Sequence, residues 1–339
     1  MSLRVVFMGT PEFAVPCLNG LIEAGHTVIA AVSQPSKPVG RGQVLTPPPV
    51  AAAAAAEGIP VFQWPRLSNE SYEALSALAP DLCVVVAYGK ILPQRYLDLP
   101  RLGCLNVHAS LLPRWRGAAP IQWAVIDGDT RTGVCVMRME AGLDTGPVAR
   151  VATTAIGPDE TAGDLHDRLS LLGADTLVDA VAELEAGRAL FRPQLENLTG
   201  PDAEAGVTYA VRLEKTHGLL DWTWDAKRLH DRIRGCHPWP GAYVERADGP
   251  FKILASRVAA DVSIGERAEG ASGASVGRKP GGVSIGEPGT IVAHEADGPR
   301  VACGGGSIVL TKVQRPGRKV VSGVDFLRGA ADFAVGTRL

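Results

Sequence analysis

Cysteines are few in this 339-residue sequence, and no two of them stand close together in it. There is no C-x-x-C spacing, and no cysteine stands in a cluster with histidine. These absences argue against a disulfide framework and against a zinc site, so we expect buried, reduced thiols and no metal. The six cysteines are Cys17, Cys83, Cys104, Cys135, Cys236 and Cys303.

Long apolar runs are also lacking. A helix that spans a bilayer needs about 18 apolar residues, and the longest low-complexity apolar stretch, residues 50–56, is mostly alanine. The first nine residues are apolar over too short a length for a secretory signal, and they run directly into a strand-and-turn pattern. We therefore expect a bacterial-type cytoplasmic protein with no membrane partner.

The sequence has almost no net charge, with a formal value of −2 at pH 7. The charge is uneven, however: basic residues outnumber acidic ones by 19 to 14 over residues 210–339, and acidic residues outnumber basic ones by 22 to 15 before them. This asymmetry suits a nucleic acid that contacts mainly the C-terminal part. Charge alone favours the simpler interpretation, which is ordinary variation of a protein surface.

Short β-branched runs alternate with helical patterns through the first half of the chain. Such alternation of strands and helices predicts a doubly wound, mostly parallel sheet of the Rossmann-like type, in which ligands bind beyond the carboxyl ends of the strands. We place this domain at residues 1–187. Its predicted strands lie at 3–8, 27–33, 60–62, 82–87, 104–108 and 133–139, and its predicted helices at 68–78, 117–126 and 161–186.

The second half reads as a smaller, separate domain. Residues 188–207 are rich in Gly, Pro, Asn and Asp, which predicts a linker. Residues 208–339 then combine one helix at 225–234 with short strands at 242–246, 250–257, 289–293, 299–303 and 307–313, which predicts a small OB-like β-barrel. The Gly-, Ser- and Ala-rich stretch 261–288 reads as a flexible surface insertion.

Two polar residues share one face of a predicted strand. Asn106 and His108 are two positions apart, so both project from the same side near the carboxyl end of the strand. An amide donor beside an imidazole can polarise a carbonyl and hold its developing oxyanion, as acyl transfer requires. Taken alone, such residues are more often a structural pair whose hydrogen bonds are satisfied within the protein.

A carboxylate stands between glycines after the next strand. Gly142 and Gly146 allow the backbone to turn tightly around Asp144, which directs this side chain toward the same sheet edge. A carboxylate near His108 would orient the imidazole or accept a proton through water. An ordinary turn aspartate that caps its own loop is an equally good interpretation of this segment alone.

Six segments spread over most of the chain form a recognisable set. They are VFMGTPEFA at 6–14, QPSKPVGRG at 34–42, the block 106–120, the loop 142–147, IRGCHPWPGA at 233–242 and QRPGRK at 314–319. With these segments the sequence resembles the 10-formyltetrahydrofolate-dependent formyltransferases and, within them, the methionyl-tRNA formyltransferases. Only the stretch 261–288 looks foreign to that pattern.

The resemblance implies a reaction. The formyl group of 10-formyltetrahydrofolate, a co-substrate, moves to the α-amino group of methionine on initiator tRNA, and the N-formylmethionyl-tRNA serves translation initiation. The amine attacks the formyl carbon directly, without a covalent enzyme intermediate. Asn106 and His108 hold the oxygen of the tetrahedral intermediate, while Asp144 supports the histidine and helps relay the amine proton. Members of the family act as monomers, so a monomer is expected.

The resemblance also implies binding sites. The flexible loop with Lys37 and Arg41 is implied to contact the tRNA acceptor stem, with the basic face of the barrel on the tRNA backbone. The sequence pattern alone also predicts that this loop is exposed, because both residues stand among Pro and Gly. The implied folate site is lined by Ser110, Leu111, Leu112 and Pro113, and the strand end at 84–88, including Val86 and Tyr88, walls the pterin pocket.

Three alternatives stay open from the sequence. The same site chemistry could serve a glycinamide ribonucleotide or sugar-nucleotide formyltransferase, or a formyltetrahydrofolate hydrolase or dehydrogenase module. A dinucleotide-dependent oxidoreductase fits poorly, because the turn at 9–14 lacks the second and third glycines of that fingerprint. A non-catalytic tRNA-binding protein is disfavoured because Asn106, His108 and Asp144 are all in place.

Overall fold

The computed structural model describes residues 2–40, 42–197, 206–260, 286–329 and 333–339. The chain forms two compact units, each built from more than one segment. Unit 1 comprises Met1–Ile121, Thr130–Ile156 and Asp164–Arg212, and unit 2 comprises Gln122–Asp129, Gly157–Gly163 and Leu213–Leu339. Two short segments that the predicted boundaries assign to the first domain therefore fold with the second unit.

Unit 1 is built on a seven-stranded sheet in the order β10-β9-β7-β6-β1-β2-β5. The five strands from β7 to β5 run parallel, and β9 and β10 continue the sheet antiparallel. The predicted mostly parallel sheet is confirmed. The strands are β1 (Arg4–Gly9), β2 (Thr27–Val32), β5 (Val61–Phe62), β6 (Leu82–Val86), β7 (Cys104–His108), β9 (Arg131–Arg138) and β10 (Val148–Ala155).

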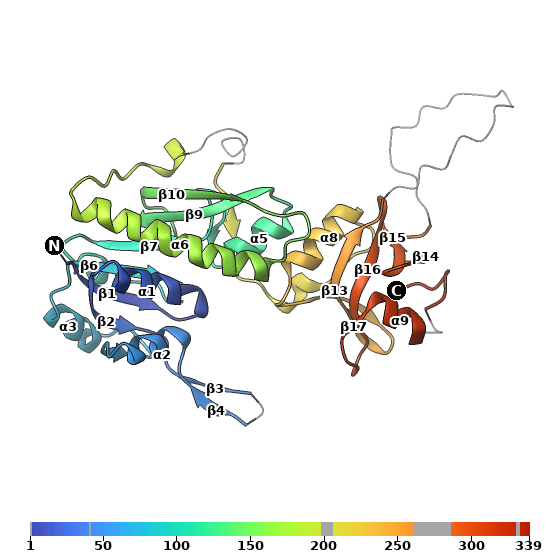
Figure 1. The fold of residues 1–339 in the computed structure, drawn as a ribbon, viewed down its shortest axis with the longest axis horizontal. Helices are drawn as coiled ribbons and strands as arrows, with labels where there is room; N and C mark the ends of the chain where they lie inside the picture. Colours follow the sequence, from blue (N-terminus) through green and yellow to red (C-terminus); the bar gives the residue numbers. More distant parts are fainter. Residues whose placement is uncertain (1, 41, 198–205, 261–285, 330–332) are drawn as a thin grey trace. The chain divides into compact units, whose positions relative to one another are not determined.

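Helices cover both faces of this sheet (Figure 1). Helix α6 packs on one face, where Gly173 lies against Val107 of β7 and Val134 of β9. The other face carries a cluster in which Leu75 packs with strand residues such as Met8 and Val85. The helices of this unit are α1 (Val15–Glu23), α2 (Pro49–Ala56), α3 (Asn69–Ala77), α4 (Gln94–Leu97), α5 (Pro120–Ile126, which continues into unit 2) and α6 (Ala162–Glu185).

The chain order places a ligand-binding edge in unit 1. From β1 the chain moves outward to β2 and β5, then returns to β6 on the other side of β1 and proceeds to β7. The connections leave in opposite directions on the two sides of this point, and open α/β sheets bind ligands beyond the carboxyl ends of the strands at such a point. The loops after β1, β6 and β7 are therefore the ones positioned to bind a ligand.

Unit 2 is built on an antiparallel sheet in the order β12-β13-β16-β15-β14, with β17 paired to β16. Along β13, Phe251 and Ile253 point inward and Lys252 outward, which is the period-two pattern of a half-buried strand. The elements are β12 (Ala242–Arg246), β13 (Gly249–Val258), β14 (Ile291–Glu295), β15 (Gly298–Ala302), β16 (Ser307–Gln314), β17 (Val321–Ser322), α8 (Ala226–Gly235) and α9 (Gly323–Gly329).

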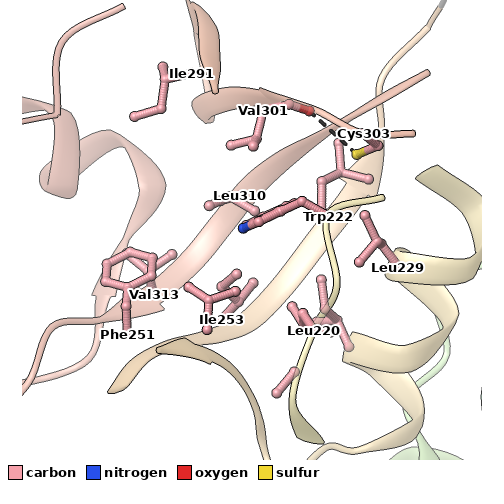
Figure 2. Close-up of a cluster of buried hydrophobic side chains, with 14 of the residues drawn as sticks. Leu220, Trp222, Leu229, Phe251, Ile253, Ile291, Val301, Cys303, Leu310 and Val313 are labelled. Carbon is pink, nitrogen blue, oxygen red and sulfur yellow. Dashed lines mark hydrogen bonds between the residues drawn. The ribbon is translucent and has the colours of Figure 1, made fainter. Parts of the chain in front are cut away.

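The core of unit 2 is a single cluster of buried apolar side chains. Figure 2 shows residues from α8 and the sheet converging around Trp222. Helix α8 begins at Asp225, whose side chain accepts a hydrogen bond from the Arg228 amide and so caps the helix. Its apolar residues Leu229 and Ile233 face the cluster. Unit 2 thus contains the short strands predicted for the second half of the chain, arranged as an antiparallel sheet.

Buried charges of α8 hold the segment Gly157–Gly163 within unit 2. Arg234 pairs with Asp231 at 2.7 Å, and the two residues are 6% and 4% exposed. Arg234 also donates to the carbonyl of Gly157 at 3.2 Å and to that of Glu160 at 2.9 Å. This segment is therefore attached to unit 2 by charged, buried hydrogen bonds rather than by chain continuity alone.

Replacing Arg234 with alanine should destabilise unit 2. Among the described residues, the change leaves the buried Asp231 carboxylate with Lys227 as its one charged partner, which lies 2.6 Å away and is largely exposed. It also removes the donor for two carbonyls. We expect a loss of about 3 kcal/mol in the free energy of unfolding, measured by urea denaturation. Arg328→Ala, which breaks the exposed pair with Asp325, is the control. Equal effects of the two variants would contradict this account of Arg234.

All six cysteines are buried. Burial raises the pKa of the Cys17, Cys135 and Cys303 thiols to about 12. Thiols with such values are not nucleophiles at neutral pH. The prediction of buried thiols is confirmed. Within the described ranges there is no group of His, Cys, Asp and Glu residues that could hold a metal ion, and no helix is long and apolar enough to cross a membrane.

Candidate active site

Asn106 and His108 lie on β7, at the edge where the parallel strands end. Asn106 is half-buried, paired in register with Val85 of β6 and Met137 of β9. Its amide forms no side-chain hydrogen bond with any part of the chain that the structure describes. His108 follows two positions later and is 6% exposed. The amide of Asn106 is therefore a donor without a protein partner, unlike the satisfied structural pair that was the simpler interpretation.

The two ring nitrogens of His108 have different partners. Nε2 lies 2.9 Å from the main-chain carbonyl oxygen of Trp115. A carbonyl only accepts hydrogen bonds, so Nε2 carries a proton and donates it. Nδ1 lies 3.7 Å from Oδ2 of Asp144. The geometry thus commits one nitrogen to the backbone and leaves Nδ1, beside a carboxylate, for chemistry.

Asp144 is held in the loop that follows β9. Its Oδ2 accepts a hydrogen bond of 2.8 Å from the amide of Gly117, in the two-residue strand β8 (Arg116–Gly117). The loop needs its glycine at 146, because a Cβ there would lie 1.8 Å from the carbonyl oxygen of Arg138. The structure therefore brings His108 and Asp144 together, as the sequence pattern suggested, and shows why Asp144 is more than a cap of its own turn.

Backbone strain is concentrated at this edge. Ala87, Trp115 and Asp144 have φ values of 46°, 62° and 50°, in the left-handed region that favours glycine. They lie in the segments that follow β6, β7 and β9, respectively. Such conformations cost about 1–3 kcal/mol each and persist only where the surrounding structure enforces them. Two of them follow the carboxyl ends of the parallel strands β6 and β7, and the third carries the carboxylate that lies 3.7 Å from His108.

The predicted folate residues differ in what they expose. The hydroxyl of Ser110 is buried and donates to the Arg114 carbonyl at 2.6 Å, so it shapes the loop. Leu112 and Pro113 are buried as well, and Leu111 is half-buried. Within this loop Leu111 therefore offers the most accessible side chain.

The side chains of Val86 and Tyr88 are not accessible to a ligand. Both side chains are buried, and the Tyr88 ring packs in the cluster beneath the sheet. Burial raises the pKa of the Tyr88 hydroxyl to about 12. The Tyr88 carbonyl accepts hydrogen bonds of 3.0 Å from Oγ1 of Thr10 and Nε2 of Gln34, which joins the ends of β1, β2 and β6.

Lys37 lies apart from these residues, on an exposed hairpin. The hairpin consists of β3 (Lys37–Val39) and β4 (Val44–Thr46), and all six residues are exposed. Val39 and Leu45 are among the most exposed apolar side chains of the chain. Arg41, predicted to contact the same partner as Lys37, lies outside the described residues, as does nearly all of the stretch 261–288.

Sequence reasoning missed two residues next to the site. Gln194 contacts the main chain of the Asp144 loop, and Thr208 contacts Trp115. Gln194 comes from the stretch 188–207, whose composition predicted a linker, and Thr208 is the first residue after it. A lone glutamine or threonine gives no signal of this kind, because its partners lie 48 to 93 residues away.

The chain matches two family models. The model described as formyl transferase matches residues 3–181, and the one described as formyl transferase, C-terminal domain, matches residues 212–331. A methionyl-tRNA formyltransferase of Methylobacterium sp. is 47% identical over 342 residues, which cover 100% of both chains. That of Roseobacter denitrificans is 46% identical over 330 residues, covering 97% of this chain and 96% of its own.

Solved structures with the same fold include a sugar formyl transferase and a protein in complex with tetrahydrofolic acid. WlaRD, a sugar 3N-formyl transferase, matches with a TM-score of 0.62 at 14% identity over 94% of this chain and 100% of its own. HypX from Aquifex aeolicus, in complex with tetrahydrofolic acid, matches with a TM-score of 0.59 at 14% identity over 98% of this chain and 48% of its own. At such identities the likeness shows the fold alone.

Proposed function

The chain belongs to the formyl transferase family, and on that premise we propose that it moves the formyl group of 10-formyltetrahydrofolate to the α-amino group of methionyl-initiator tRNA. The products are N-formylmethionyl-tRNA, used to initiate translation, and tetrahydrofolate. One observation carries the proposal: Asn106 and His108 lie two positions apart near the carboxyl end of β7, and the imidazole of His108 lies 3.7 Å from the carboxylate of Asp144. The choice of methionyl-tRNA as the acceptor is supported by relatives named methionyl-tRNA formyltransferase that are about 45% identical over nearly the whole chain.

The folate supplies an activated formyl group on N10, and the protein must stabilise charge and move one proton. Asn106 donates its side-chain N–H to the formyl oxygen, where negative charge develops as the amine adds. Nδ1 of His108 takes the proton released by the attacking amine and becomes a second donor toward the same region. Asp144, 3.7 Å from Nδ1, stabilises the resulting imidazolium. The proton then passes to the leaving N10 nitrogen, so no group of the enzyme is consumed.

Folate binding is assigned to the loops after β6 and β7. Ser110, Leu112 and Pro113 set the shape of the second loop, and Leu111 is its accessible apolar side chain. Val86 and Tyr88 contribute main-chain groups, because their side chains are buried. Amide and carbonyl groups fixed at strand ends are suited to the donor and acceptor pattern of a pterin edge.

The tRNA partner is assigned to exposed basic residues. Lys37 lies on the hairpin, and we place Arg41 in the same contact. The excess of Lys and Arg in the C-terminal half suits contacts to phosphates, which position a nucleic acid without reading its sequence. Because Asn106, His108 and Asp144 all belong to one chain, we propose that a monomer is active. Its place of action is the cytoplasm, where translation initiates.

A substrate comparison tests the proposal. Purified protein is given 10-formyltetrahydrofolate with charged initiator tRNA, with a dTDP-linked amino sugar or with glycinamide ribonucleotide, and formylated product is measured for each. We expect kcat/KM for the charged tRNA to exceed that for either small amine by several orders of magnitude. Formylation of the sugar or the ribonucleotide without formylation of the tRNA would replace the proposed acceptor.

A further inference from the structure

A single buried glutamine binds the main chain at Asp144 and two residues after it. Gln194 lies in the 3-10 turn η2 (Gln194–Asn197) and is 5% exposed. Its Nε2 donates to the carbonyl of Asp144 at 2.7 Å and to that of Gly146 at 2.9 Å. Its Oε1 accepts from Nε and Nη2 of Arg116 at 3.0 and 2.6 Å. Both ends of this amide are therefore used twice, which leaves the side chain one orientation.

Arg116, which donates to Gln194, belongs to β8, the strand that also binds the Asp144 carboxylate. Arg116 anchors Gln194, and the next residue, Gly117, donates its amide to Oδ2 of Asp144. Asp144 is thus restrained at its carboxylate by β8 and at its backbone by Gln194. A left-handed residue needs such restraint, because without it the backbone relaxes to an unstrained conformation.

Trp115, the hydrogen-bond partner of His108, is restrained in a similar way by Thr208. Oγ1 of Thr208 accepts a hydrogen bond of 2.8 Å from the amide of Trp115, another left-handed residue. The Trp115 carbonyl is the group that accepts from Nε2 of His108. The strand β11 (Tyr209–Ala210) then pairs with β8 in parallel, and the amide of Arg116 donates to the Thr208 carbonyl.

From these contacts we propose that Gln194 and Thr208 are positioning residues of the His108–Asp144 pair. These two residues, which follow α6 in the chain, then set the distance between Nδ1 of His108 and the carboxylate of Asp144. Gln194 acts through the Asp144 backbone, and Thr208 acts through Trp115. The effect on kcat that this inference predicts rests on the proposed function, whereas the hydrogen bonds of Gln194 and Thr208 do not.

A double-mutant cycle tests the role of Gln194. Gln194→Ala should lower kcat by roughly 10- to 100-fold, with KM for both substrates within about twofold of that of the wild-type protein, because the hydrogen bonds described for Gln194 go to Arg116, Asp144 and Gly146 and not to the residues assigned to folate binding. In an Asp144→Asn background the same change should have almost no further effect on kcat, since Gln194 acts only through the lost carboxylate. An equal loss of kcat in both backgrounds would overturn the proposal.

Matched variants separate positioning from general stability. Thr208→Val keeps the side-chain shape but removes the acceptor, so it should lower kcat by about 10-fold, whereas Thr208→Ser should restore it. Ser170→Ala removes another buried hydroxyl in unit 1, which donates to the Phe13 carbonyl at 2.8 Å, and it should leave kcat unchanged. If Thr208→Ser is as impaired as Thr208→Val, or Ser170→Ala as impaired as Gln194→Ala, the assignment is wrong.

A readout without turnover distinguishes this inference from the proposed function. In protein labelled with ¹⁵N-histidine, Gln194→Ala should shift the ring resonances of His108, and Ser170→Ala should not. The resonances of His230, which belongs to unit 2, should stay in place in both. Shifts at His108 in a protein that fails to formylate methionyl-tRNA would support the positioning role and reject the acceptor. Unchanged His108 resonances in Gln194→Ala would reject the positioning role.

Discussion

Replacing Asn106 with alanine should lower kcat by about 10²- to 10³-fold while leaving the Kd for the folate substrate within a fewfold of its wild-type value. The amide of Asn106 has no partner among the described residues, so it is preorganised to donate to an oxygen that acquires charge during the reaction. Its contact with the uncharged formyl oxygen of the bound substrate is weaker, because little charge has developed there. The loss therefore appears in turnover and much less in ground-state binding.

The measurement pairs single-turnover rates with equilibrium folate binding. Asn106→Asp is the second variant, because it keeps the size of the side chain but replaces the donor with an acceptor, and it should be at least as slow as Asn106→Ala. Asn19→Ala, on the exposed side of α1, serves as the control for an asparagine that the reaction does not need. A rate within about fivefold of wild type in Asn106→Ala would remove this residue from the mechanism.

Sequence patterns were sufficient for most of unit 1 because its strands are buried on both faces. Continuous apolar runs such as those of β1 and β6 predict parallel strands covered by helices. Strand β10 was not predicted, because Val148–Ala155 alternates half-buried and exposed residues at the sheet edge. The alanine-rich segment 50–56 gave no amphipathic signal either, although alanine favours the helix α2 that it forms. The family resemblance, based on six segments, is confirmed by the two family models.

Contacts between distant segments lie beyond what local patterns can predict. Nothing in residues 157–163 indicates that their carbonyls accept hydrogen bonds from Arg234, some 75 positions later. The composition of residues 188–207 suggested a linker, and it could not indicate that Gln194 is buried against the Asp144 loop. Composition reports average polarity, whereas burial of one polar side chain depends on the partners that the fold brings to it.

Within the candidate site, periodicity predicted which residues meet but not what each atom does. The spacing of Asn106 and His108 places them on one strand face, and Gly146 marks the tight turn beside Asp144. Which nitrogen of His108 binds the backbone and which faces Asp144 follows only from the position of the Trp115 carbonyl. The catalytic roles of these residues therefore stay predictions that kinetics must test.

Replacing Asp144 with asparagine should lower kcat by about 100-fold or more with little change in overall stability. The amide oxygen of asparagine can still accept the hydrogen bond from Gly117, and the main chain keeps its bonds from Gln194, so the loop is retained. What disappears is the negative charge 3.7 Å from Nδ1 of His108. The imidazolium that forms when His108 takes the amine proton then lacks its counter-charge in a mostly buried site, where such charges are costly.

The control for Asp144→Asn is another histidine–aspartate pair in the same unit. His166 lies 2.9 Å from Asp167, whose side chain is 86% exposed, so Asp167→Asn makes the same chemical change where water screens the charge. That variant should turn over at the wild-type rate. Because both substitutions remove one carboxylate charge beside an imidazole, their difference isolates the location of the charge. Equal rates for the two variants would show that the carboxylate of Asp144 acts only on structure, and the proton transfer would then have to be assigned to another group.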